Sequence, residues 1–142
     1  MALDRRLSLV TLGVIDLVRA RSFYEQLGRV PRSRADDDVV FFQVSGLVVA
    51  LWDRGRLADD TAAPDPGGWG GITLARNVRS PDEVDEILRE VTGADGRVLR
   101  DAAATFCGGY SGVFADLDGR PWEVAHNPFW TIDDIGATLL ED

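Results

Sequence analysis

The sequence predicts an α+β fold of two βαβββ modules, whose strands form a curved, incompletely closed mixed sheet around a cleft with the helices outside. The order strand, helix, strand, strand occurs twice along the 142 residues. The two halves align at residues 9–13 and 71–75, which share Thr-Leu in the middle. Each repeat is too short to bury a sheet by itself, so a common core is expected. The chain is therefore interpreted as a single domain, residues 1–142, built from a duplicated unit.

The first module opens with a buried strand, because residues 9–14 are a run of β-branched and aliphatic side chains. Asp16 then stands at an N-cap position, ahead of a helix that begins at Leu17 and stops at Gly28. The module is expected at about residues 7–53, with further strands at 39–44 and 47–52 joined through Ser45-Gly46, and a linker at about 54–68.

The second module repeats this order at about residues 69–127. Ser80 and Glu83 form a capping box with Pro81 at the first helical position, and Gly93 ends the predicted helix. Its strands are expected at 71–78, 97–99, 112–115 and 122–125, with a turn at 116–119; a tail at 128–142 is expected to hold a short helix over 131–140.

Composition excludes several classes of function. The net charge of −9 and the absence of a basic stripe argue against nucleic-acid binding. No apolar run approaches the roughly 20 residues that cross a bilayer, and no signal peptide is recognisable, so a cytoplasmic location is expected. All fifteen basic residues are Arg, which excludes Schiff-base lysine chemistry. The single cysteine, Cys107, has no basic partner near it in sequence and is interpreted as a loop thiol.

Two motifs resemble a known family. One is residues 14–17 (Val-Ile-Asp-Leu) followed by residues 22–24 (Ser-Phe-Tyr), and the other is the run from Phe114 to Glu123 around Asp116-Leu117-Asp118-Gly119. Both are similar to signatures of the glyoxalase/bleomycin resistance/extradiol dioxygenase proteins, the vicinal oxygen chelate superfamily. The match covers nearly the whole chain; Leu117 replaces the usual Pro of the second signature.

The resemblance implies four metal-ligand positions, which fall at Leu9, Ala50, Gly71 and Glu123. Divalent ions need three or four convergent oxygen or nitrogen donors, and the first three side chains supply none. The only histidine, His126, is expected on the opposite strand face from Glu123. We therefore expect neither a catalytic metal nor a cofactor.

Strand alternation predicts which side chains line the cleft. Several aromatic rings and one carboxylate are expected there, with the glycine-rich segment from Phe106 to Tyr110 as a lip over the opening. Trp122 and Val124 are assigned to the core, and strand aromatics are in general more often core residues than ligand contacts. The expected ligand-binding residues are Leu9, Thr11, Phe41, Trp52, Trp69, Phe106, Tyr110, Phe114 and Glu123; Val48, Ala50 and Thr73 are expected on the same faces.

Three functions remain open. The first is a metal-independent binding protein of the bleomycin-resistance type, which sequesters an aromatic or polycyclic natural product and so confers antibiotic resistance. The second is a glyoxalase-, isomerase- or dioxygenase-like enzyme that uses Glu123, and the third is an interaction module without a tight ligand site. Glu123 is expected either to contact the ligand or to pair with an arginine such as Arg76. A homodimer is expected in each case, because sheet edges need cover and the resembled family usually assembles this way.

Overall fold

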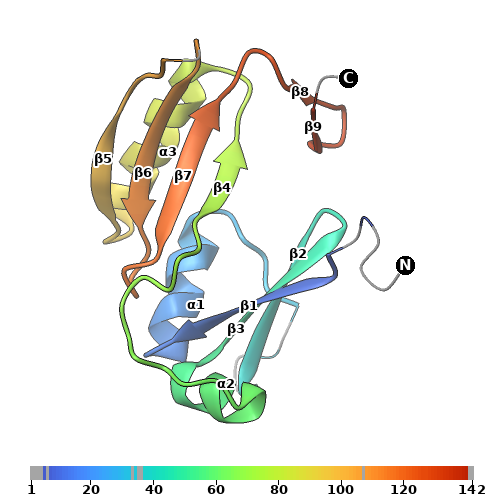
Figure 1. Cartoon of the computed structure of the whole chain (residues 1–142), viewed down its shortest axis with the longest axis vertical. Coiled ribbons are helices and arrows are strands. Elements are labelled where there is room, and N and C mark those ends of the chain that lie inside the picture. The colour runs from blue at the N-terminus through green and yellow to red at the C-terminus, as the bar shows by residue number, and fades with distance from the viewer. Residues whose placement is uncertain (1–4, 6, 33, 35–36, 107, 141–142) are drawn as a thin grey trace. The chain divides into compact units, whose positions relative to one another are not determined.

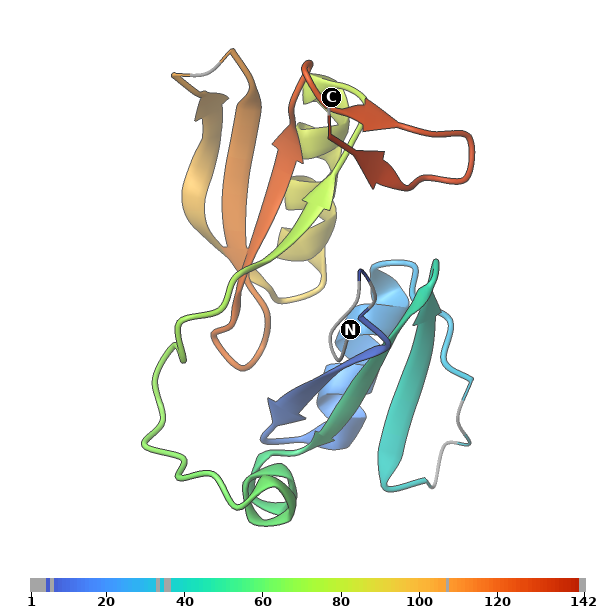
Figure 2. The same cartoon turned by 45° about the vertical axis from the view of Figure 1, so that its right-hand side comes forward.

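The computed structural model describes residues 5, 7–32, 34, 37–106 and 108–140. The chain divides into two compact units, Met1–Pro66 and Gly67–Asp142. Figure 1 and Figure 2 show that each unit holds an open mixed sheet with a helix along one face. The predicted α+β class, with paired modules and open mixed sheets, is confirmed.

Unit one packs its helix on a three-stranded sheet. Phe23 and Phe42 are almost fully buried, and the ring of Tyr24 lies 6.2 Å from that of Phe42. The helix therefore covers the face that carries Phe42. The elements are β1 (Leu9–Val14), α1 (Leu17–Gln26), β2 (Val39–Val44) and β3 (Leu47–Asp53), in the sheet order β1-β3-β2 with β1 parallel to β3.

Local sequence sets the bounds of α1 as predicted. The Asp16 carboxylate accepts a hydrogen bond from the amide of Arg19 at 3.1 Å, which satisfies one of the free amides of the first turn. Gly28 follows the last turn with φ of 95°, a conformation that glycine adopts without strain. The β2–β3 hairpin also turns at Ser45-Gly46 as expected.

The first unit has no complete fourth strand within the described residues. Pro31 makes a single antiparallel bridge to Phe42, and the amide of Arg32 donates to the carbonyl of Phe41 at 2.8 Å. Proline has no amide hydrogen to continue a ladder. Within the described residues, unit one therefore has three strands, and the Pro31 bridge lies between α1 and β2, where the βαβββ order has its second strand.

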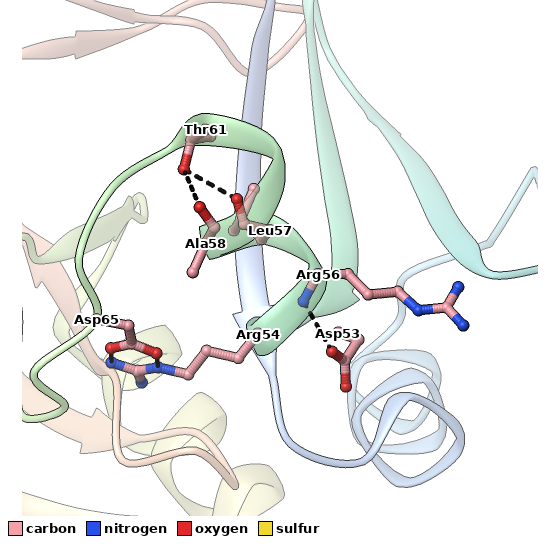
Figure 3. A network of polar contacts seen from close by, with 7 residues as sticks. All are labelled: Asp53, Arg54, Arg56, Leu57, Ala58, Thr61 and Asp65. Atoms are coloured by element: carbon pink, nitrogen blue, oxygen red, sulfur yellow. Dashed lines mark hydrogen bonds and ion pairs between the residues drawn. The ribbon is translucent and has the colours of Figure 1, made fainter.

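A helix occupies the first half of the predicted linker. In α2 (Arg54–Thr61), Asp53 is the N-cap and accepts from the amide of Arg56 at 3.0 Å. The Arg54 guanidinium then binds both carboxylate oxygens of Asp65, at 2.6 and 2.7 Å, and so ties the following segment back to the helix (Figure 3). Composition predicted a linker here, but the N-cap aspartate was the more informative signal.

Unit two is the fuller module. The predicted strand over 71–78 is shorter in the structure, because Gly70 and Gly71 have φ near 80° and extended strand pairing begins only at Leu74. The elements are β4 (Leu74–Asn77), α3 (Pro81–Gly93), β5 (Arg97–Ala104), β6 (Tyr110–Ala115) and β7 (Pro121–His126), in the sheet order β4-β7-β6-β5 with β4 parallel to β7.

The helix of unit two begins as the capping box predicted. The Ser80 hydroxyl oxygen accepts from the amide of Glu83 at 3.3 Å, with Pro81 in the first turn. Val84, Leu88 and Val91 are buried against the sheet. In Figure 1 and Figure 2, α3 runs along the face of the sheet that β5, β6 and β7 present to it.

The predicted C-terminal helix over 131–140 is wrong. The segment forms a small hairpin of β8 (Thr131–Ile132) and β9 (Thr138–Leu139). The Asp133 carboxylate accepts from the amides of Ile135 and Ala137, and Gly136 has φ of 91°, so this turn chemistry prevails over helix formation. Arg79 docks the hairpin by donating to the carbonyls of Ile132 and Asp133. No helix among the described residues is long and apolar enough to cross a membrane.

Candidate functional site

The open face of unit one, meaning the sheet face turned away from α1, gathers the side chains predicted for this module. Thr11 of β1, Ala50 of β3 and Phe41 of β2 lie side by side in one row across the three strands. Leu9 lies opposite Val48 in the next row, so alternation places it on the same face. Leu9 is 46% exposed and Phe41 is 42% exposed, which leaves apolar surface uncovered by this unit.

Trp52 also belongs to this face and carries an unsatisfied donor. It lies opposite Gly13 of β1 and Val39 of β2, one row beyond Thr11. Its indole Nε1 is buried and has no hydrogen-bond partner among the described residues. A buried donor without a partner costs free energy, so such groups in native proteins call for an acceptor from water, ligand or partner. The open face of unit one thus combines rings, aliphatic carbon and one free N–H.

Phe114 was predicted on the ligand face of the second module, and this orientation is wrong. It lies opposite Trp122, and the two rings are parallel with centroids 6.1 Å apart. Both are buried on the face that α3 covers. The prediction transferred the β2–β3 register to the second hairpin, but Glu123 faces Val113 instead. The five-residue turn between β6 and β7 shifts the register by one, which exchanges the two faces.

Tyr110 also faces the helix. It starts β6, and its hydroxyl donates to the Asp85 carboxylate of α3 at 2.7 Å. This hydrogen bond, partial burial and the negative charges of Asp85 and Asp82 raise the pKa of Tyr110 above its usual value. The predicted lip over a cleft is therefore not the position of this ring, which anchors the start of β6 to the helix.

The remaining aromatic residues of the predicted set lie outside the two sheets. Trp69 is 64% exposed, and its Nε1–H donates to the carbonyl of Ile72 at 3.0 Å. Phe106 is fully exposed in the β5–β6 loop. Neither packs with the other predicted residues of its unit. Cys107 lies outside the described residues.

Glu123 is the carboxylate of the open face of unit two, the face turned away from α3. It shares a row with Val113 of β6 and Ala75 of β4 and is partly exposed. Its side chain forms no hydrogen bond or ion pair with any residue that the structure describes. Arg76 is aligned with Val124 on the other face and donates to the carbonyl of Asn77, so the alternative of a Glu123–Arg76 pair is not realised.

The metal positions implied by the family can be assigned more firmly from the helix caps. Asp16 and Ser80 are the N-caps of α1 and α3, so the residue equivalent to Leu9 is Thr73 rather than Gly71. A threonine hydroxyl adds little, because divalent ions in proteins are held mainly by His, Asp, Glu or Cys. Leu9 and Ala50 offer no donor atom, and Glu123 alone remains. These residues do not fit a divalent ion.

His126 does not restore a ligand set. It lies opposite Tyr110, on the face covered by α3, and its Nδ1 donates to the carbonyl of Val78 at 3.2 Å. The predicted opposite orientation of His126 and Glu123 is confirmed. Among the residues that the structure describes, no group of three or more His, Cys, Asp or Glu side chains could hold a metal ion.

One charged residue of the open face was missed from the sequence. Arg100 lies opposite Val113 on β5, and its guanidinium donates to the carbonyl of Ser111 at 3.1 Å and to its hydroxyl at 3.0 Å. Ser111 is buried, with 5% of its surface exposed. The sequence predicted a strand only over 97–99, so it placed Arg100 beyond the sheet. The sequence signal that could have placed Arg100 in the sheet was the alanine-rich stretch that ends at Ala104, through which β5 continues.

Comparisons with known proteins agree with this architecture. Residues 6–124 match the family model of the Glyoxalase/Bleomycin resistance protein/Dioxygenase superfamily. The structure is similar to that of a glyoxalase-related enzyme from Fulvimarina pelagi, with 34% sequence identity, a TM-score of 0.90 and coverage of 97% of this chain and 99% of that one. A search of curated proteins gave no significant match.

Two more distant structures share the fold. Lactoylglutathione lyase from Agrobacterium tumefaciens is 23% identical, with a TM-score of 0.65 and coverage of 87% of this chain and 94% of that one. The fosfomycin resistance protein FosX from Mesorhizobium loti is 17% identical, with a TM-score of 0.64 and coverage of 88% and 93%. Fold, signatures and family match together show that this chain belongs to the glyoxalase/bleomycin resistance protein/dioxygenase superfamily.

Proposed function

We propose that this protein binds an aromatic or polycyclic small molecule without a catalytic metal, and that sequestration of this ligand confers resistance to it. The observation that carries the proposal is the open face of unit one. Phe41 leaves ring surface exposed there, Leu9 adds aliphatic surface, and Trp52 holds a buried N–H without a partner. Ligand sites are mostly apolar with a few polar groups that fix orientation, and this face has that composition.

The donor chemistry of the family's metal positions supports binding over metal-assisted turnover. Leu9, Ala50 and Thr73 stand where convergent donors are needed, and Glu123 is the one strong ligand left. The Glu123 carboxylate can serve as an acceptor for a ligand N–H or O–H. Among family relatives of known structure is a fosfomycin resistance protein, which makes resistance a reasonable role to test here.

Fluorescence titration tests the proposal directly. Riboflavin, doxorubicin and other polycyclic compounds would be added to the protein while tryptophan emission is followed. We expect saturable quenching at micromolar concentrations, and loss of most of the quenching in Trp52→Phe. Trp130→Phe is the matched control, because Trp130 lies outside the sheets in the C-terminal segment.

A second substitution tests whether the Phe41 ring contacts the ligand. Phe41→Ala removes a half-exposed ring from the open face, and we expect affinity for a bound polycycle to fall about five- to ten-fold, given the usual worth of ring stacking plus burial. Phe129→Ala removes a ring of similar exposure outside the sheets and should leave affinity unchanged. Equal affinities for wild type and Phe41→Ala would contradict the proposal, as would the absence of quenching by every compound.

The alternative is an enzyme that uses Glu123 as a general base. It is favoured by one observation: the Glu123 carboxylate has no partner among the described residues. The relatives include a protein described as a lactoylglutathione lyase, so formation and cleavage of lactoylglutathione are the first reactions to assay. Turnover that Glu123→Gln abolishes while ligand binding persists would favour the enzyme over the binding protein.

We also propose a homodimer. β1 and β4 each lie at the edge of their sheet in the described part of the chain, and exposed edges favour pairing with another chain. Sedimentation velocity at micromolar concentrations would show a species of twice the chain mass. A single monomeric species at all concentrations up to about 100 μM would refute the dimer.

A further inference from the structure

The open face of unit two has small side chains around three charged ones. Three rows cross its strands: Arg97 with Ala115 and Pro121; Arg100 with Val113, Glu123 and Ala75; and Ala103 with Ser111, Ala125 and Asn77. Most of these residues are Ala, Ser, Val or Pro, whose short side chains extend little above the sheet. Arg97, Arg100 and Glu123 are the charged residues of these rows, so the face carries two positive charges and one negative charge among short side chains.

Arg100 is held in place on the open face of unit two by hydrogen bonds. Two of its five N–H donors go to one residue, the carbonyl and the hydroxyl of Ser111, at 3.1 and 3.0 Å. Ser111, the second residue of β6, is buried and paired with Ala125 of β7 and Ala103 of β5, so the anchor itself is held in the sheet. Both acceptors are neutral. The guanidinium therefore keeps its full positive charge and three further donors, and its plane is fixed before any ligand arrives.

Arg100 has no carboxylate partner among the described residues, although the chain as a whole is acidic. The protein has 24 acidic and 15 basic residues, and several of its arginines are paired, as Arg120 is with Asp116. Among the residues that the structure describes, Arg100 forms no ion pair. Arg97 occupies the neighbouring row and adds a second positive charge at the same edge. The two arginines thus bring positive charge to this edge of a sheet in a chain whose net charge is −9.

Glu123 stands in the same row as Arg100, with only Val113 between them. Two strand spacings separate the Cα atoms of Arg100 and Glu123 by about 10 Å. No ion pair joins the two side chains among the described residues, so each charge remains available to a ligand. A flat or extended molecule of ordinary drug size spans such a gap.

We propose that the open face of unit two binds a small molecule through its charged groups: Arg100, positioned by Ser111, binds an anionic group, a carboxylate, phosphate, phosphonate or sulfonate, while Glu123 accepts from a donor or cationic group at the other end of the molecule. The proposal rests on the proposed binding of a small molecule, concerns unit two alone, and selects ligands with this charge pattern. Arg–oxyanion pairs are bidentate and charge-assisted, so they discriminate strongly between an anion and its neutral analogue.

A pair of pyrene probes tests the anionic subsite. 1-Pyrenebutyrate and the neutral 1-pyrenebutanol share the ring system and the spacer and differ in the terminal group. Binding of each would be followed by fluorescence anisotropy with the full-length protein. We expect wild-type protein to bind the butyrate at least ten-fold more tightly than the butanol, and the preference to weaken as salt rises.

Matched variants assign the preference to Arg100. Arg100→Gln should make the affinities for butyrate and butanol equal. Arg100→Lys should restore part of the difference, because lysine keeps the positive charge but lacks the planar set of N–H donors of a guanidinium. Arg89→Gln makes the same change of charge on α3, on the covered side of the sheet, and should leave the preference intact. Ser111→Ala should lower the preference several-fold without changing binding of the butanol, which marks Ser111 as a positioning residue.

Glu123 is tested with 1-pyrenemethylamine as the cationic probe. Glu123→Gln should weaken binding of the amine by several-fold and strengthen binding of the butyrate slightly, because a repelling charge has been removed. Equal wild-type affinities for butyrate and butanol, or a preference unchanged by Arg100→Gln, would overturn this inference and leave the proposed function standing. Failure of all three probes to bind at about 1 mM would overturn both.

Discussion

Tyr110 links the start of β6 to α3 through a single hydrogen bond to Asp85, and this bond makes stability depend on pH. The folded state raises the pKa of the phenol, so it holds the proton more tightly than the unfolded chain does. The stabilisation is therefore fully present below the ordinary phenol pKa of about 10, and it is lost as the pH rises through the higher folded value. We predict that Tyr110→Phe lowers Tm at neutral pH.

Thermal unfolding between about pH 7 and pH 11 checks this prediction. The difference in Tm between wild type and Tyr110→Phe should be constant up to about pH 9 and shrink above pH 10. Asp85→Asn is the companion variant, because its amide oxygen can still accept the hydrogen bond from the phenol although the negative charge is gone. Curves that stay parallel through pH 11 would show that the phenol proton contributes nothing.

Residue types were predicted well from the sequence, and residue orientations only where the register was right. Thr11, Phe41 and Ala50 share a row as expected, because the tight Ser45-Gly46 turn leaves one possible pairing. Phe114 was turned to the wrong face because the longer turn before β7 shifts the register by one residue. Such a shift leaves composition and periodicity unchanged, so the sequence offers no sign of it.

At the scale of elements, the contact between α3 and the sheet depends on a glycine. A Cβ on Gly112 would lie 2.7 Å from the Leu88 Cδ1 atom and 3.2 Å from backbone atoms of Ala102. The leucine methyl can move, but it lies in a packed core, and the Ala102 backbone cannot give way. We predict that Gly112→Ala destabilises the protein by about 1–3 kcal/mol, the usual cost of overpacking.

Chemical denaturation of Gly112→Ala measures this cost. Gly93→Ala is the matched control, because nothing lies within 4 Å of a Cβ at Gly93 and its position in the last turn of α3 is helical. We expect the control to be neutral or more stable by up to about 1 kcal/mol, since alanine is the better helix former. Similar midpoints for the two variants would mean that α3 is not packed closely on β6.

Elements were predicted where a cap or a tight turn stood beside a periodic run, as for α1 and α3. The errors lie where two signals competed. At α2 a composition typical of loops hid a good N-cap in Asp53. In the C-terminal segment a short run that suggested a helix lost to Asp133, whose carboxylate closes a hairpin turn. In both places an aspartate that bonds to nearby amides decides the local structure.

At the scale of the whole molecule, the duplication was visible because both halves keep the order strand, helix, strand, strand. Its detailed alignment was two residues out, because it matched the shared Thr-Leu letters rather than the helix N-caps Asp16 and Ser80. Caps are fixed by backbone geometry, whereas a two-letter match arises readily by chance. The correction keeps the same strand face and replaces Gly71, which has no side-chain donor, by Thr73, which has a weak one, so the argument against a metal site changes only slightly.

The donor set of the whole chain leads to a last prediction. Of the four positions, Leu9 and Ala50 have no donor, Thr73 has a weak one, and Glu123 has a strong one. A metal bound to the folded state alone would stabilise it by mass action, so its removal would lower Tm. We predict that dialysis against EDTA leaves both Tm and the affinity for 1-pyrenebutyrate unchanged. Addition of Zn²⁺, Mn²⁺ or Mg²⁺ should raise neither of them.

Elemental analysis of protein purified without chelator completes the test, because a slowly exchanging ion could survive dialysis. We expect well under one divalent ion per chain, and the same trace amount in Glu123→Gln as in wild type. One ion per chain that is lost in Glu123→Gln, together with a fall in Tm after chelation, would contradict the prediction. Ligands would then have to come from Thr73, from the backbone or from a second copy of the chain, and the enzyme alternative would become the stronger one.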